Sequence, residues 1–287
     1  MRRLRGTRSR PAASVTAAAA LMLASPAADA RTIGGFEDIA NMAHDMVEGL
    51  WPDDLAVPGL SARLGVGGLY APEYRGASDN EWTLAPIIRL QYKDRVTFSG
   101  QKLKIRAHRG EHWGAGGFVR YRFGRDEKDR PVLQGLGDIG DTWEIGPFVE
   151  YRTGPARFTI ELRPGLQNSQ GLTTYLEAAT GIYKSERWRV QGLAYLLWGD
   201  KENLRTHFGV SEEQAAASTY GLPVYRPSSG LVETRLAIGA EYFLSEKIQI
   251  GQFVSYGWFL DEAASSPIVK AGSKGQFTAG AGLIFSF

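Results

Sequence analysis

Apolar and polar residues alternate along most of the chain from Leu60 to Phe287, in a series of short segments. Because successive side chains of a β-strand point to opposite faces, each such segment predicts a strand with one apolar and one polar face. The clearest example is the last segment, in which every second residue is apolar: Phe277, Ala279, Ala281, Leu283, Phe285 and Phe287. The pattern therefore predicts an all-β fold for residues 60–287.

The polar faces of these segments carry charges of both signs, and aromatic residues end many of the apolar faces. Tilted strands of about ten residues cross a bilayer, and aromatic girdles mark its two interfaces. We therefore predict a transmembrane antiparallel β-barrel whose apolar faces contact outer-membrane lipid, with Phe285 and Phe287 in the closing strand. The charges are predicted to line a solvated lumen and to pair across strands: Arg89, Arg120, Arg122, Glu144, Glu150, Arg157, Glu161, Arg163, Glu177, Arg189, Glu233, Arg235 and Glu241.

The number of strands follows from the connections, which are short on the periplasmic side of such barrels and longer outside. Eleven segments alternate clearly, but two periplasmic termini require an even number. We predict twelve strands, with a short additional strand near Pro131–Leu136. Ten strands is the alternative, if two weak segments fold inward. A change of parity between Phe98 and Leu103 is interpreted as a β-bulge at Gly100-Gln101 within a single strand.

The first thirty residues have the organisation of a secretory signal peptide. Five arginines precede an apolar stretch over residues 12–25, and Ala28-Asp29-Ala30 fits a cleavage site. We therefore predict a cleaved signal peptide over residues 1–30 and a location in the outer membrane of a Gram-negative cell. Cleavage removes five Arg and one Asp, so the formal net charge changes from +2 to −2. A nucleic-acid partner is accordingly not expected.

Residues 31–59 follow a different pattern, with apolar residues at helical spacing between Phe36 and Leu50. This pattern predicts a short amphipathic helix in a periplasmic N-terminal segment. Two interpretations remain open. The segment is either a leader that packs on the barrel or is partly disordered, or it is a plug or a partner-binding helix.

Candidate catalytic and metal-binding groups are few. The chain contains no Cys and four His, at positions 44, 108, 112 and 207. His108 and His112 flank a β connection rather than one helix face, which does not favour a metal site. His207 lies near Ser211 and Ser218, as a hydrolase would need, but no acid is positioned beside it. We predict no enzymatic activity, no metal and no cofactor.

Motifs in the predicted outer connections carry a resemblance to a known family. The motifs are Pro72-Glu73-Tyr74-Arg75-Gly76, Gly124-Arg125, Phe208-Gly209-Val210-Ser211, Gln214–Ser218, Gly221–Tyr225 and Ser266-Pro267-Ile268-Val269. In this order they resemble the MipA/OmpV (MltA-interacting protein) family of outer-membrane proteins over roughly residues 60–287. His207 is a departure, because an aromatic residue is expected there. The residues that carry the resemblance are Tyr74, Gly76, Arg125, Phe208, Gly209, Val210, Ser211, Ser218, Ser266 and Pro267.

The resemblance implies a non-enzymatic barrel that acts as a scaffold for peptidoglycan-remodelling enzymes. The partners it implies are a lytic transglycosylase and a bifunctional penicillin-binding protein. A passive channel and a small-ligand or adhesion barrel are the alternatives. The sequence does not choose among these functions, and it does not decide whether the lumen is open or plugged.

Overall fold

A computed structural model describes Ile39, Met42, Leu50 and residues 59–287. The predicted signal peptide over residues 1–30 lies outside the described residues. Of the predicted segment 31–59, only these three positions and Gly59 are described. Ile39 and Met42 have helical backbone conformations. The rest of the predicted amphipathic helix is not described.

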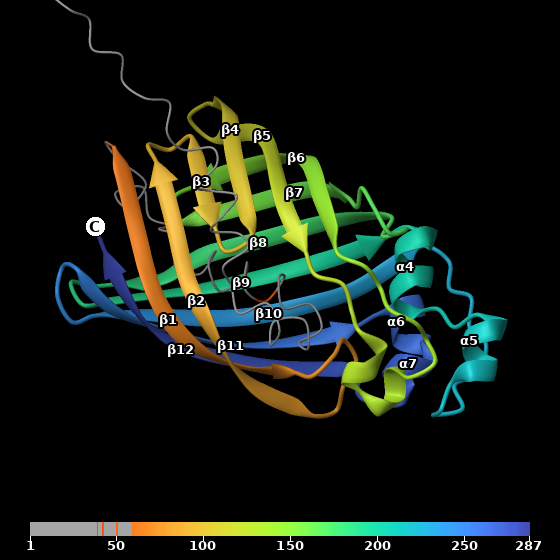
Figure 1. Cartoon of the computed structure of the whole chain (residues 1–287). Helices are drawn as coiled ribbons and strands as arrows, with labels where there is room; N and C mark the ends of the chain where they lie inside the picture. Colours follow the sequence, from red (N-terminus) through yellow and green to blue (C-terminus); the bar gives the residue numbers. More distant parts are fainter. Residues whose placement is uncertain (1–38, 40–41, 43–49, 51–58) are drawn as a thin grey trace, which may run out of the picture.

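Twelve antiparallel strands form one closed barrel, in which each strand pairs with its neighbours in sequence and β1 pairs with β12 (Figure 1). The all-β transmembrane-barrel fold and the count of twelve are thereby confirmed, and ten is wrong. The strands are β1 Leu60–Pro72, β2 Asn80–Tyr92, β3 Val96–Ser99, β4 Lys102–Arg109, β5 Trp113–Arg122, β6 Thr142–Thr153, β7 Ala156–Pro164, β8 Leu172–Lys184, β9 Trp188–Gly199, β10 Gly230–Phe243, β11 Ile248–Phe259 and β12 Gly275–Ser286.

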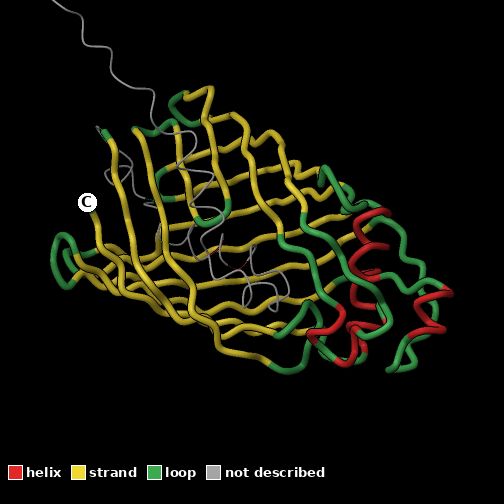
Figure 2. Tube along the Cα trace, viewed as in Figure 1, coloured by secondary structure: helices red, strands yellow, loops and turns green. Residues whose placement is uncertain are grey.

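The two ends of the barrel differ in their connections (Figure 2). One end carries tight turns and the C-terminus, whereas the other carries long connections with helices. In outer-membrane barrels the end with tight turns generally faces the periplasm. No helix in the described part of the chain is long and apolar enough to cross a membrane. The helices are η2 Glu127–Asp129, η3 Pro131–Leu133, α4 Lys201–Phe208, α5 Glu212–Ala217, α6 Asp261–Ser265 and α7 Pro267–Lys270.

The twelfth strand arises where the sequence was interpreted as one bulged strand. The prediction of a strand near Pro131–Leu136 is wrong, because that stretch starts with the 3₁₀ turn η3 in an outer connection. Instead, Gly100-Gln101 forms a two-residue turn that reverses the chain between β3 and β4, and Ser99 pairs with Lys102. Gly100 adopts a φ of 55°, which glycine tolerates without a steric cost. A bulge and a two-residue turn shift the parity equally, so the alternation alone did not separate them.

The short hairpin β3–β4 leaves one side of β2 incompletely paired. β3 pairs with Arg89–Tyr92 only, and the Gly100 amide donates to the Ile88 carbonyl at 3.1 Å. Beyond that point, no described strand pairs with this edge of β2. Pro86 lies on the unpaired stretch, where its missing N–H removes one unpaired donor.

The two faces of the wall divide the side chains as the alternation predicts. Outward positions such as Val66, Leu236 and Leu283 are exposed apolar residues, whereas inward positions of the same strands are largely buried. An exposed apolar surface of this kind is stable in lipid but not in water. Trp82, Trp113, Trp188 and Trp258 lie on this outward face near the ends of their strands.

Candidate functional site: the barrel lumen and the outer cap

The charged residues predicted to face the lumen are almost completely buried, at 1–6% exposure, except for half-buried Arg189. The sequence interpretation expected a wet interior, and the structure differs in this respect. Charges removed from water are costly unless they are paired and hydrogen-bonded. Their geometry therefore decides whether the lumen is a passage or a packed interior.

Each carboxylate on the inner face of β6–β8 binds at least one cation. Arg120 Nη2 and Arg122 Nη1 lie 2.6 and 3.3 Å from the two oxygens of Glu144. Arg157 Nη2 donates to Glu177 Oε1 at 2.8 Å. These contacts join neighbouring strands through their side chains, in addition to the backbone ladder.

Cations of β4 complete the network, and the sequence analysis missed them. Lys102 Nζ contacts Glu161 Oε1 at 2.5 Å, and Arg106 Nη2 contacts Glu150 Oε2 at 2.6 Å. Lys104 Nζ lies 3.2 Å from the other Glu150 oxygen. The signal was present in the sequence, since these cations alternate with Leu103 and Ile105, but their inward direction was not used.

A second network surrounds Arg235 on the opposite part of the wall. Its guanidinium donates to Glu233 at 2.9 Å, and its Nη1 donates to the hydroxyls of Ser255 and Thr278, each at 3.1 Å. Tyr195 also donates to Glu233, at 3.0 Å. The polar groups of this charged pair are thus satisfied by hydrogen bonds from β9 to β12.

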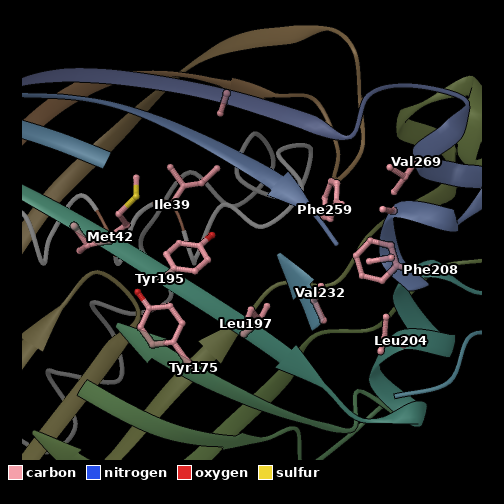
Figure 3. Packing of buried hydrophobic residues seen from close by; sticks show 14 of the residues in the cluster. Ile39, Met42, Tyr175, Tyr195, Leu197, Leu204, Phe208, Val232, Phe259 and Val269 are labelled. Atoms are coloured by element: carbon pink, nitrogen blue, oxygen red, sulfur yellow. The ribbon is translucent and has the colours of Figure 1, made fainter. Parts of the chain in front are cut away.

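A buried apolar cluster also lies on the inner face on this side, as Figure 3 shows. Tyr175, Tyr195 and Leu197 belong to the same buried cluster as Ile39 and Met42 of the N-terminal segment. Leu50 belongs to this cluster as well. Three described residues of the N-terminal segment therefore pack against inward-facing side chains of the barrel.

The outer connections pack into a second buried apolar cluster, which we call the outer cap: Tyr74, Ala77, Leu133, Leu136, Val210, Leu222 and Ile268. These residues come from four connections that are far apart in sequence and gather at one end of the barrel (Figure 2). Arg75 extends from the cap into the lumen, where it contacts Glu233 at 3.2 Å and lies over the rings of Phe208 and Phe259.

The family-motif residues in the longest connections are structural parts of the cap. The buried Ser266 hydroxyl donates to the Phe208 carbonyl at 2.7 Å, and buried Pro267 begins α7. Ser211 caps α5 in a reciprocal capping box with Gln214. The Ser218 hydroxyl accepts a hydrogen bond from the Leu222 backbone amide at 3.2 Å.

A side chain at either of the two motif glycines would be strained or would clash with neighbouring atoms. Gly76 has a φ of 104°, its amide donates to Gln276 Oε1 at 3.1 Å, and a Cβ there would lie 3.0 Å from Val269. Gly209 ends α4, where a Cβ would lie 2.5 Å from the Arg205 carbonyl oxygen. Val210, the next residue, is buried in the outer cap and forms a β-bridge with Tyr225.

Burial changes the pKa of two motif residues outside the membrane-spanning strands. Desolvation raises the pKa of the Tyr74 hydroxyl to about 12, and electrostatic interactions with Tyr220 and with the carboxylates of Glu73 and Asp79 add to this shift. Desolvation lowers the pKa of the Arg125 guanidinium to about 10, against the opposing effect of Asp138 and Glu127. Both shifts reflect the exclusion of water from the cap.

The histidines do not form a catalytic or metal-binding group in the described part of the chain. His108 and His112 are exposed, and His207 contacts the Gln170 side chain at 3.2 Å. No group of three or more potential metal ligands occurs among the described residues. His44 lies outside them. The Ser211 hydroxyl near His207 is engaged in capping α5.

A closed antiparallel barrel with an apolar outer face is the architecture of outer-membrane β-barrel proteins. Within this class, the chain belongs to the family of the MltA-interacting protein MipA, whose profile matches residues 64–287. The family resemblance of the outer motifs is thereby confirmed, and both fold and family point to the outer membrane. No curated protein matches the chain.

Several solved outer-membrane barrels are similar in fold. The translocator domain of the autotransporter NalP from Neisseria meningitidis has a TM-score of 0.42 at 11% identity, covering 95% of this chain and 97% of that one. OprD from Pseudomonas aeruginosa has a TM-score of 0.36 at 12% identity, covering 80% and 66%. The NanC porin has a TM-score of 0.38 at 8% identity, covering 79% and 99%.

Proposed function

We propose that this protein is a non-enzymatic outer-membrane scaffold for peptidoglycan-remodelling enzymes. Family membership supports a lytic transglycosylase as one partner, because the family is named for its interaction with MltA. A bifunctional penicillin-binding protein is the second proposed partner.

The observation that carries this proposal over a channel is the burial of the lumen charges. Glu144, Arg120 and Arg157 are at most 2% exposed and are held in ion pairs. Residues that conduct a hydrated solute stay in contact with water, whereas residues of a rigid anchor do not. The packed lumen and the outer cap therefore support a sealed barrel.

The proposed docking surface for these enzymes is the tight-turn end, because both act in the periplasm. Exposed residues there include Arg187 in the β8–β9 turn and Lys247 in the β10–β11 turn. At the opposite end, Arg226 is an exposed cation that pairs with Glu212. The two ends therefore offer matched positions for testing where a partner binds.

We also propose that the mature chain begins at Arg31 and that Ile39, Met42 and Leu50 are part of a plug rather than of a leader packed outside the barrel. The packing of Ile39, Met42 and Leu50 with inward-facing barrel residues supports this choice. Mass spectrometry of the protein from outer membranes tests the first point. A purified chain that retains residues 1–30 would contradict it.

The scaffold proposal is tested by retention of both enzymes on the immobilised full-length mature barrel in detergent. We expect both to be retained by the wild type and by Arg226→Glu, and less by the double variant Arg187→Glu, Lys247→Glu. Clean failure of the wild type with both enzymes would contradict the scaffold role. Equal loss with Arg226→Glu would contradict the assignment of the docking end.

A further inference from the structure

One outward position of the barrel wall carries a carboxamide where its neighbours are apolar. Gln252 lies in β11 and is exposed on the same face as Ile250 and Val254. It lies between the aromatic residues of this part of the wall, because Tyr242 pairs with Ile250 on one side and Tyr256 follows on the other. Aromatic girdles mark the two membrane interfaces, so Gln252 faces hydrocarbon.

The carboxamide of Gln252 makes no hydrogen bond with the described part of the chain. Two outward threonines differ in this respect. The Thr234 hydroxyl donates to the Tyr195 carbonyl at 2.9 Å, and the Thr180 hydroxyl donates to the Gly181 carbonyl at 3.4 Å. Lipid tails neither donate nor accept hydrogen bonds, so a polar group that faces them without a partner is costly. A partner for Gln252 therefore has to come from another molecule in the membrane.

The surface around Gln252 is low enough for such a molecule to approach. Gln252 lies in a groove of about 490 Å³ on the outward face of β10, β11, β12 and β1. It pairs with Ala240 of β10 and with Ala281 of β12, and Gly68 of β1 continues the floor beside Ala281. Small residues allow two membrane-embedded surfaces to come close together. The longer side chain of Gln252 extends from this floor.

The chemistry and the depth of Gln252 both fit a second copy of this chain. A carboxamide donates through its NH₂ group and accepts through its oxygen, so two carboxamides form a pair with two hydrogen bonds. Two copies inserted in the same direction are related by a two-fold axis along the membrane normal. This axis brings the same face of both copies together and places the two Gln252 side chains at equal depth. Lipid headgroups lie outside the apolar band and do not reach this depth.

We propose that the protein forms a two-fold symmetric dimer through this groove, in which the Gln252 side chains of the two copies hydrogen-bond each other. Ala240 and Ala281 allow the two walls to approach. The dimer uses the lipid-facing wall, whereas the proposed scaffold role uses the tight-turn end. Failure of one proposal therefore leaves the other standing.

The test is energy transfer between donor-labelled and acceptor-labelled copies of the full-length mature barrel in lipid vesicles, measured over a range of protein-to-lipid ratios. The chain contains no Cys, so Glu213→Cys at an exposed position of α5 provides a single labelling site. We expect the transfer to saturate as for a dimer. Gln252→Leu should require an about tenfold higher protein-to-lipid ratio, because it removes the carboxamide pair.

Thr180→Leu is the matched control. It also replaces an outward polar side chain by leucine, but the hydroxyl that it removes is bonded within its own chain. This variant should associate as the wild type does. Ala240→Phe keeps the carboxamide but fills the groove beside it, and it should weaken the dimer. The heat-modified mobility shift in electrophoresis verifies that each variant is folded.

Transfer no greater than that of randomly distributed barrels, for the wild type at every ratio, would mean that lipid covers the groove, and the proposal would be wrong. A folded Gln252→Leu variant that associates like the wild type would also overturn it, because the dimer would then form through another face.

Cross-linking locates the interface independently. Val254→Cys, at the next outward position after Gln252, should give a covalent dimer with a short bifunctional thiol reagent in vesicles. Ile160→Cys, at an equally exposed position of β7, should not. Equal cross-linking of the two variants would contradict the assignment of this face.

Discussion

The outer cap and the charged lumen are both buried, but they are stabilised by different interactions. The outer cap is an apolar cluster assembled from four connections. The polar side chains of these connections mainly accept hydrogen bonds from backbone N–H groups at the first turns of short helices. The lumen of β4–β8 is an array of ion pairs on regular strands, in which Glu144, Glu150 and Glu161 each bind at least two cations. The difference indicates that the cap tolerates loss of a hydrogen bond better than the lumen does.

The same difference explains why the two regions were detected by different features of the sequence. The lumen charges were predicted because polar residues recur at every second position of the strands. The cap residues show no periodicity and were found only through the family motifs. The motif residues turn out to hold the cap together, as Ser266 and Gly76 illustrate. A family motif in outer connections is therefore not by itself evidence of a partner-binding surface.

The largest loss of folding stability is expected from Glu161→Gln in the lumen. The substitution leaves Lys102 and Arg163 buried without their shared carboxylate, at an expected cost of about 3–5 kcal/mol in the free energy of unfolding. Urea unfolding in lipid vesicles measures this cost. Glu213→Gln, at an exposed position of α5, is the control and should be neutral. A change below 1 kcal/mol for Glu161→Gln, on the order of an exposed pair, would show that the lumen is hydrated.

A comparable loss, about 3–5 kcal/mol, is expected from Phe208→Ala at the junction of cap and lumen. Phe208 is 1% exposed, and its ring packs edge-on against Phe259 at 5.5 Å. Tyr220→Ala, on an exposed ring of the same connection, should have little effect. Proteolysis of the outer connections in intact cells should increase for Phe208→Ala only. Unchanged protection would mean that the cap does not depend on this contact.

Leu283→Arg tests the outer face against the inner one. Leu283 is exposed on β12, and an arginine facing mid-bilayer costs about 2–4 kcal/mol. Leu283→Ala removes the same side chain without adding a charge and should cost less. The measurement is the urea midpoint together with the heat-modified mobility shift in electrophoresis. Equal stability of the two variants would mean that this face does not contact lipid.

The smallest expected change in stability concerns Tyr74 of the outer cap and appears only at alkaline pH. The raised pKa of Tyr74, about 12, exceeds its ordinary value of 10.0 because burial disfavours the phenolate. Its stabilising contribution is therefore complete below pH 10 and is lost as the pH rises through 12. Tyr74→Phe should remove this part of the pH dependence, whereas Tyr92→Phe, on an exposed ring at the opposite end of the barrel, should retain it. Identical alkaline profiles for wild type and Tyr74→Phe would contradict the burial argument.

The alternation in the sequence was sufficient to predict the barrel and the direction of its apolar face. It was not sufficient for the origin of the twelfth strand, since the turn at Gly100-Gln101 and a bulge give the same parity. The helices of the outer connections, such as α4, were not predicted because they are short and are stabilised by contacts with distant parts of the chain. The burial of the lumen charges depends on side-chain geometry across strands, which a linear pattern does not contain.

The central claim is that paired charges and a packed cap seal the barrel. It is tested most directly by conductance of the purified mature protein in planar lipid bilayers. The packed lumen predicts no channel conductance across a bilayer in which insertion of the folded barrel has been verified. Reproducible single-channel steps from the folded wild type would contradict the claim and would favour the passive channel.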